Sequence, residues 1–488
     1  MAFLDFMAPP KHKAELPAEK VDKTYKAMRW KVFIGIYLGY AAYYLVRKNL
    51  SFAGADMMAQ GYLDTSGVGD AMAGLPIAYA VSKFLMGGLS DRSDARKFLT
   101  FGLIISALVM IVAGVIPYPK DNFGATTAIL FVLTCLTGWF SGMGWPPCGR
   151  VMSQWFSTNE RSFKMSIWNT AHNIGSSGLA KLATIGGGSL LVLLGFNEVE
   201  AGWREAFIIP SIAALAVAGL CWWFIRDTPE SCGLPPIDKY RNDFTGAKAK
   251  KGEEDKIPFK TLFVDYVLKN KMLWLIGIAN ILVYLVRNGI SDWLPIYFQQ
   301  TLKDSLSLSI EEAKDISKSL YQYHMYAAIP GTLIAGWLSS KFFQGRCAPV
   351  NVICMAITAI GAFIYWQAEP IAAMLHIEYL TTVTAALIIT GFAVYGPVAM
   401  ISIQAIAIVP KNAAGTAAGF MGLLGYLIGD AFLSKIAFGR IVEHGGWDLT
   451  FVGFFAASVI AAVICLLAMG KEKKMFEARL AAAKAEQK

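Results

Sequence analysis

The chain has 488 residues, of which 55% are hydrophobic and only 16% are charged, whereas about a quarter are charged in an ordinary soluble domain. A soluble protein with so few polar side chains cannot cover its surface, so the composition excludes a soluble enzyme, a disordered chain and a nucleic-acid-binding protein. The formal net charge of +9 must therefore arise from something other than an acidic partner. We predict an integral membrane protein.

Residues 1–30 precede the first apolar segment and are rich in lysine. They contain no apolar core followed by a small-residue cleavage site, which distinguishes them from a secretory signal peptide. We expect a cytosolic N-terminal tail. The seven cysteines show neither CxxC spacing nor a zinc-ligand pattern, so we expect neither a disulfide framework nor a metal site.

Apolar segments of about 20 residues, the length that crosses a bilayer as a helix, recur along the whole chain. Twelve are predicted, at residues 31–52, 67–89, 98–117, 125–148, 163–191, 205–225, 272–297, 313–339, 348–367, 374–404, 413–438 and 448–469. Lys and Arg mark the cytoplasmic side because they are retained there. The N-terminal tail and every second loop after it hold 30 Lys and Arg, against four clear ones in the opposite loops. We therefore expect both termini in the cytoplasm.

The longest hydrophilic stretch, residues 227–260, separates the sixth and seventh segments and contains the charged run Lys248–Lys256. This position predicts a cytosolic linker between two six-helix halves, residues 31–226 and 261–470. The chain then ends in a second cytosolic tail, residues 471–488. A duplicated six-helix unit is typical of a transporter whose site lies between its halves.

A repeated sequence places an arginine inside corresponding apolar segments. Tyr-Leu-Val-Arg ends at Arg47 in the first segment and again at Arg287 in the seventh. A charge near the bilayer centre costs at least about 2.5–3.5 kcal/mol, so it generally faces an aqueous cavity or a partner. Two guanidiniums suit a tetrahedral oxyanion and would neutralise a phosphate dianion. We expect a phosphate clamp with Lys48 and Lys83 nearby, the alternative being a structural ion pair between Arg287 and Asp292.

Histidine, asparagine and tyrosine side chains add further candidate ligands. His172 lies deep in the fifth segment near Asn169, and histidine titrates near the second ionisation of a phosphate ester. His324 in the eighth segment is another candidate. Five tyrosines share a helix face with an arginine or lie in other segments, and either line the cavity or pack between helices: Tyr40, Tyr44, Tyr79, Tyr284 and Tyr395.

Asp430 and Lys435 in the eleventh segment are five residues apart and do not share a clean face of an α-helix. We expect them to pair with other helices or to form a helix-end pair. The sequence contains no Walker loop, no Ser/His/Asp grouping and no cluster of metal ligands. We therefore expect neither enzymatic activity nor a cofactor.

The loop after the second segment reads Gly87-x-x-Ser90-Asp91-Arg92-x-x-x-Arg96-Lys97. Other distinctive stretches are GYAAYYLVRKN from Gly39, GMGWPPCGR from Gly142, SIWNTAHNIG from Ser166, RDTPESCGLPP from Arg226, YGP from Tyr395 and PKNAAGTAAGF from Pro410. The loop resembles the cytoplasmic signature of the major facilitator superfamily, and the resemblance assigns Gly87, Asp91, Arg92 and Arg96 to a conformational switch. The other stretches are similar to the organophosphate:phosphate antiporters of that superfamily.

The resemblance implies an all-α membrane protein with twelve transmembrane helices in two pseudo-symmetric six-helix halves. It implies a monomeric secondary active transporter in a bacterial cytoplasmic membrane, importing glycerol-3-phosphate or a similar organophosphate in exchange for inorganic phosphate. Arg47 and Arg287 would form the phosphate clamp. Lys48, Lys83, His172 and the five tyrosines would take part in binding or closure as the halves rock about the site.

Two positions depart from the family pattern. The glutamate of the eighth helix falls on Met325, beside His324, and Ser340 replaces the aspartate of the second signature loop. Residues 427–430 resemble the hexose-phosphate members instead. The alternatives are therefore antiport of a hexose phosphate or phosphoglycerate, and a membrane sensor of sugar phosphates that does not transport. The short linker and tail, without an added signalling domain, favour transport.

Overall fold

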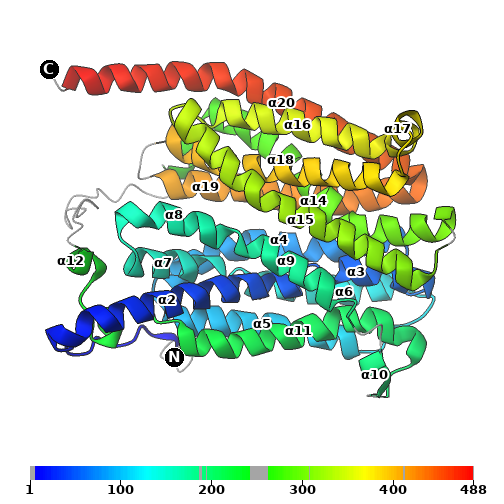
Figure 1. The fold of residues 1–488 in the computed structure, drawn as a ribbon, viewed down its shortest axis with the longest axis horizontal. Coiled ribbons are helices and arrows are strands. Elements are labelled where there is room, and N and C mark those ends of the chain that lie inside the picture. Colours follow the sequence, from blue (N-terminus) through cyan, green and yellow to red (C-terminus); the bar gives the residue numbers. More distant parts are fainter. Residues whose placement is uncertain are drawn as a thin grey trace. The chain divides into compact units, whose positions relative to one another are not determined.

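The computed structural model describes residues 6–185, 189–193, 195–241, 262–306, 308–409 and 413–486. Regular structure in these ranges is helical throughout (Figure 1). The chain divides into two compact units, Met1–Leu63 with Gly74–Asp255, and Asp64–Ala73 with Lys256–Lys488. The predicted linker lies outside the described residues from residue 242 onward, including the run Lys248–Lys256.

The first unit is built from the helices that precede residue 242 (Figure 1), the last two of which lie within the predicted linker, residues 227–260. They are α2 (Ala18–Tyr43), η1 (Tyr44–Val46), α3 (Asn49–Ala59), α4 (Thr65–Ser90), α5 (Ala95–Val115), α6 (Phe123–Ser141), α7 (Trp145–Trp155), α8 (Thr158–Asn169), α9 (Ala171–Leu182), α10 (Ser189–Leu193), α11 (Glu198–Phe224), η2 (Glu230–Cys232) and α12 (Ile237–Arg241). The first nine residues of α4 belong to the second unit.

The first predicted segment is a broken helix. The α2 helix tightens into the 3₁₀ turn η1, Arg47 and Lys48 follow, and α3 begins at Asn49. The Asn49 amide donates to the Leu45 carbonyl at 3.0 Å and to the Ala206 carbonyl at 2.8 Å. A side chain thus bonds main-chain groups at the break, as interrupted helices require inside a membrane.

A glycine brings α9 against this break. A Cβ at Gly175 would lie 2.1 Å from the carbonyl oxygen of Ala41 on α2, a separation that no larger residue permits. Close backbone approach through small residues is the usual way helices pack in membranes. It places the α9 residue His172 beside Tyr44, with 5.6 Å between their ring centres.

The second unit contains the remaining helices. They are η3 (Leu262–Leu268), α14 (Lys271–Leu306), α15 (Ile310–Phe342), α16 (Ala348–Trp366), α17 (Ala368–Leu375), α18 (Tyr379–Ile408), α19 (Ala414–Leu423), η5 (Leu424–Ala437) and α20 (Phe438–Glu486). Its α20 joins two helices across a kink at Gly446, where φ is 73° and ψ is 178°. Only glycine adopts this conformation readily, so the residue separates the eleventh and twelfth predicted segments.

Within the described residues, all twelve predicted segments fall on helices, and residues 186–188 of the fifth segment lie outside the described part of the chain. Within the described part of the chain, seven helical stretches are long and apolar enough to cross a membrane, and they contain eight of the predicted segments. The other four lie on α2, α4, α8–α9 and α15. These four segments carry Arg47, Lys83, His172 and His324 respectively. Arg287 and Tyr395 lie on two of the more apolar stretches, Lys271–Leu302 and Tyr379–Ile408.

Candidate anion-binding site

Arg47 of the first unit lies between two tyrosine rings. Its guanidinium carbon is 4.6 Å from the ring centre of Tyr44 and 4.5 Å from that of Tyr79. Its Nη2 also donates to the Ser141 carbonyl at 3.1 Å. Stacking on aromatic faces stabilises a guanidinium and fixes its plane. This plane carries the fork of N–H groups that binds a carboxylate or phosphate in bidentate fashion.

The rings beside Arg47 are themselves held by buried neighbours. The Tyr44 hydroxyl is 3.5 Å from that of Tyr40, and the Tyr40 ring stacks on Trp168 with centres 4.5 Å apart. The Trp168 indole donates to the Ile36 carbonyl at 3.1 Å. Sequence reasoning did not assign Trp168 a role, although the residue stands in the SIWNTAHNIG stretch and could have been found as the aromatic nearest His172.

The other predicted residues of the first unit surround this group. Lys83 Nζ is 6.0 Å from the Tyr79 ring centre and 5.6 Å from that of Trp145. Lys48 is half-buried at the helix break. His172 hydrogen-bonds through Nδ1 to the main-chain carbonyl of Asn169, which makes Nδ1 the protonated nitrogen because a carbonyl only accepts. Asn169 therefore orients the imidazole through its backbone.

In the second unit, Arg287 has a similar aromatic setting on an unbroken helix, α14. Its guanidinium carbon is 4.7 Å from the ring centre of Tyr395 and 5.7 Å from that of Tyr284. Tyr284 packs edge-on against Tyr426, with centres 4.9 Å apart. Each unit thus contains one arginine stacked on tyrosines, and the repeated arginine lies at a helix break in the first unit only.

The carboxylate of Asp292, the alternative partner considered for Arg287, lies 2.7 Å from Lys435 Nζ. Lys435 also pairs with Asp430, and all three side chains are buried. The prediction that Lys435 pairs with another helix is confirmed, whereas the expectation that Asp430 and Lys435 share no clean helix face is wrong. Residues five apart are about 140° apart around an α-helix, whereas η5 is a π-helix, whose i→i+5 bonding places them on one face.

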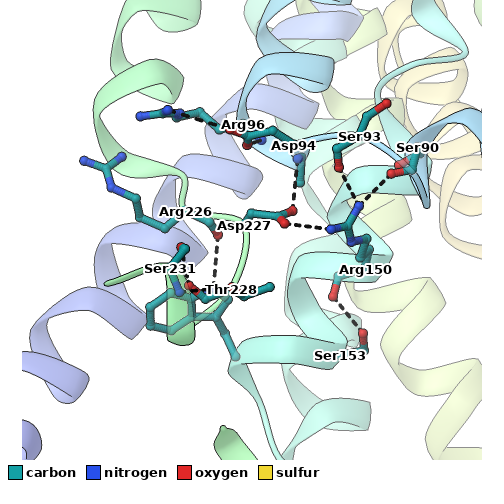
Figure 2. Close-up of polar contacts among 12 residues, drawn as sticks. Ser90, Ser93, Asp94, Arg96, Arg150, Ser153, Arg226, Asp227, Thr228 and Ser231 are labelled. Carbon is teal, nitrogen blue, oxygen red and sulfur yellow. Dashed lines mark hydrogen bonds and ion pairs between the residues drawn. The ribbon is translucent and has the colours of Figure 1, made fainter. Parts of the chain in front are cut away.

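Figure 2 shows a second polar cluster, around Arg150 on α7. Arg150 donates to the carbonyls of Ser90 and Ser93 and pairs with Asp227 at 2.6 Å. The other Asp227 oxygen accepts from the Ala95 N–H at 3.0 Å. Burial raises the pKa of Asp227, although the Ala95 N–H and the Arg150 charge oppose the shift. The cluster joins the end of α4, the start of α5, α7 and the chain after α11.

The four predicted switch residues differ in how close they lie to this cluster. Arg96 lies on the first turn of α5, 3.7 Å from the Asp94 carboxylate that caps the helix. Asp91 and Arg92 are exposed, and Gly87 lies near the end of α4. The structure therefore links Arg96 to the cluster through Asp94. Sequence reasoning missed Arg150 and Asp227, although Arg150 ends the GMGWPPCGR stretch and Asp227 lies in the RDTPESCGLPP stretch.

The chain is similar in sequence to a transporter family and in fold to solved transporters. The profile of the Major Facilitator Superfamily matches residues 36–434. The glycerol-3-phosphate transporter of Haemophilus influenzae is 41% identical over 477 residues, covering 96% of each chain. The membrane sensor protein UhpC of Salmonella typhimurium is 33% identical, covering 95% of this chain and 96% of its own. The solved xylose transporter XylE from E. coli has a TM-score of 0.62 at 14% identity, covering 89% of this chain and 98% of its own.

Proposed function

The chain belongs to the Major Facilitator Superfamily, a family of membrane transporters, and we propose that it imports glycerol-3-phosphate in exchange for inorganic phosphate. The predicted all-α transporter fold is confirmed by this membership. Support for the substrate comes from the Haemophilus influenzae glycerol-3-phosphate transporter, which is similar over nearly the whole of both chains. The proposed location is a bacterial cytoplasmic membrane, with both termini in the cytoplasm.

One observation carries the proposal: each unit holds an arginine stacked on tyrosines. Arg47 and Arg287 are the proposed phosphate-binding side chains. Arginine stays charged at any physiological pH and binds phosphate oxygens through a planar fork. Two such charges offset the dianion common to inorganic phosphate and glycerol-3-phosphate. In the first unit, Lys83 and His172 add further donors near the same rings.

Exchange follows from the cost of unbalanced charge. A buried ion that loses its counter-ion is strongly destabilised in a low-dielectric interior, so changes of conformation with the arginines unoccupied are expected to be slow. Either anion relieves this cost on its own passage through the membrane. We therefore propose alternating access that proceeds rapidly only with a phosphate-bearing ligand bound.

The test is uptake of labelled glycerol-3-phosphate into proteoliposomes that contain the purified protein. With inorganic phosphate inside, we expect rapid uptake, and with phosphate-free vesicles, uptake at the level of protein-free controls. Equally rapid uptake without internal phosphate would contradict exchange. Competition by unlabelled glucose-6-phosphate and 3-phosphoglycerate separates the two other substrate classes. Binding of a sugar phosphate without uptake under any gradient would favour a sensor instead.

A further inference from the structure

We propose that Met325 and His324 on α15 are positioning residues for Arg287, acting through Tyr395 on α18. The inference rests on the proposed function in one respect, namely that Arg287 binds the phosphoryl group. Met325 and His324 would then set the affinity of the second unit for phosphate-bearing ligands. They would do so without touching the ligand.

The first step is the contact between α15 and α18, which glycines make unusually close. A Cβ at Gly331 on α15 would lie 1.8 Å from the carbonyl oxygen of Phe392. A Cβ at Gly391 on α18 would lie 2.3 Å from the carbonyl oxygen of His324. Both contacts join backbone to backbone, so the two helices have little freedom to slide. Residues 324 and 325 of α15 therefore lie directly against α18.

The second step is a hydrogen bond that fixes the register of the two helices. His324 is fully buried, and its Nδ1 lies 3.0 Å from the Leu387 carbonyl oxygen of α18. Its ring also meets the edge of Tyr395, with centres 6.2 Å apart and planes at 63°. Leu387 and Tyr395 are eight residues apart, about two helical turns. His324 therefore contacts α18 at two levels on the face that carries Tyr395.

The third step is the contact between the tyrosine hydroxyl and a thioether. Tyr395 Oη donates to Met325 Sδ at 3.4 Å, and both side chains are buried. A buried hydroxyl needs an acceptor, and a thioether is a weak but adequate one. Because the acceptor is neutral, it places no negative charge beside the arginine that would compete with an anionic ligand.

The last step connects Tyr395 to the arginine. The Arg287 guanidinium carbon lies 4.7 Å above the centre of the Tyr395 ring. The orientation of this ring sets the plane of the guanidinium, and the plane sets the direction of its N–H fork. Rotation of Tyr395 would turn the fork away from its oxyanion geometry. Met325 and His324 restrict this rotation at the hydroxyl and at the ring edge.

The experiment is a double-mutant cycle on Met325→Leu and Tyr395→Phe. Leucine conserves the volume of methionine, and phenylalanine keeps the ring, so each change removes one side of the same hydrogen bond. We expect each single variant to raise the KM for glycerol-3-phosphate and the Kd for inorganic phosphate about threefold to tenfold. The maximal exchange rate should change little. The KM and Kd of the double variant should be no higher than those of the single variant with the lower affinity, because the two residues act through one contact.

Matched controls separate positioning from packing. Met355→Leu removes another buried methionine of the second unit, within an apolar cluster around Ile276 and Ala461, and should leave KM within twofold. His324→Leu should raise KM as Met325→Leu does, and His324→Gln, which keeps a donor, should restore part of the loss. Elution as a single symmetrical peak in detergent verifies that each variant is folded.

Three outcomes would overturn the inference while leaving the proposed function intact. They are an unchanged KM in both single variants, multiplicative losses in the double variant, and a loss confined to the maximal rate. A wild-type protein that binds inorganic phosphate but does not exchange it would overturn the proposed function instead. In that case, the phosphate Kd of the same variants still decides whether Met325 and Tyr395 are coupled.

Discussion

At the scale of single residues, the charge and the planar shape of an arginine side chain contribute separately to phosphate binding. Replacing Arg47 or Arg287 by lysine keeps the positive charge but removes the planar fork and most of the stacking on tyrosine. We expect either substitution to raise the Kd for inorganic phosphate about tenfold to a hundredfold, as loss of a charge-assisted hydrogen bond does. Titration calorimetry in detergent measures the change. Arg346→Lys, at a half-buried arginine that donates to the Phe343 carbonyl, is the control, and near-normal affinity of both site variants would reject the clamp.

Arg47 and Arg287 were visible in the sequence because a charge inside an apolar segment is conspicuous without any fold. Tyr44 and Tyr284 followed from their spacing to those arginines. Asp227 gave no such signal, since a carboxylate in a charged loop looks solvated. Its contact with Arg150, 77 residues earlier, exists only once α7 and the chain after α11 are packed together.

At the scale of elements, the π-helix η5 takes part in a buried ion cluster, in which Lys435 pairs with Asp430 and with Asp292 of α14. Lys435→Met would leave Asp292 and Asp430 buried without their shared ammonium group, which costs about 3–5 kcal/mol when one partner of a buried pair is removed. We expect a large fall in melting temperature in detergent. Adding Asp292→Asn and Asp430→Asn to Lys435→Met removes the uncompensated charges and should recover most of the loss. If the triple variant is no more stable than the single one, the cluster does not act as a charge-balanced unit.

The π-helical winding of η5 could not be predicted from the sequence, because an apolar segment indicates a helix without distinguishing an α-helical repeat of 3.6 residues from a wider one. The sequence between Leu424 and Ala437 contains no proline that would signal a change of winding. Its register is set instead by contacts with α14, where Trp293 donates to the Ser434 carbonyl at 2.7 Å. Such tertiary contacts override local preference, so a local sequence pattern does not reveal them.

A further ion pair lies on the N-terminal half of α2. Arg29 donates to the Trp155 carbonyl at 3.1 Å and pairs with Glu160, which also lies 3.9 Å from Arg241. Burial alone would raise the pKa of Glu160, but the hydrogen bond and charge of Arg29 lower it below its ordinary value of 4.5. A lowered carboxyl pKa stabilises the fold above the unfolded-state pKa, and this stabilisation is lost as the pH falls through the folded-state value.

We therefore expect the wild type to melt at a higher temperature than Glu160→Gln at pH 7. The difference should shrink as the pH is lowered below about 4.5, where the Glu160 carboxyl of the unfolded chain begins to be protonated, and it should vanish as the pH falls through the lower folded-state pKa. Glu311→Gln, at an exposed position at the start of α15, controls for the loss of one negative charge. A constant difference between pH 7 and pH 4 would show that the Glu160 charge does not stabilise the contact with Arg29.

At the scale of the whole molecule, hydropathy is enough to predict the helices, whereas the family is predicted from sequence motifs such as the loop from Gly87 to Lys97. The twelve segments were predicted because the bilayer fixes both length and apolarity, and these constraints act on every span independently of its neighbours. The interruption of the first span at Arg47 was not predicted. It depends on Asn49, whose amide reaches the Ala206 carbonyl of α11, 157 residues away.

Membrane orientation is a property of the whole chain that loop charges predict and that labelling can measure. Lys120 is exposed between α5 and α6, and Lys473 is exposed near the end of α20. If basic residues fix the orientation, an impermeant maleimide added to intact cells will label Lys120→Cys and spare Lys473→Cys, and both will react after the cells are broken. The wild type provides the background, since five of its seven cysteines are buried and Cys135 and Cys232 are partly so. Labelling of Lys473→Cys in intact cells would place the C-terminus outside and reverse the orientation of every loop.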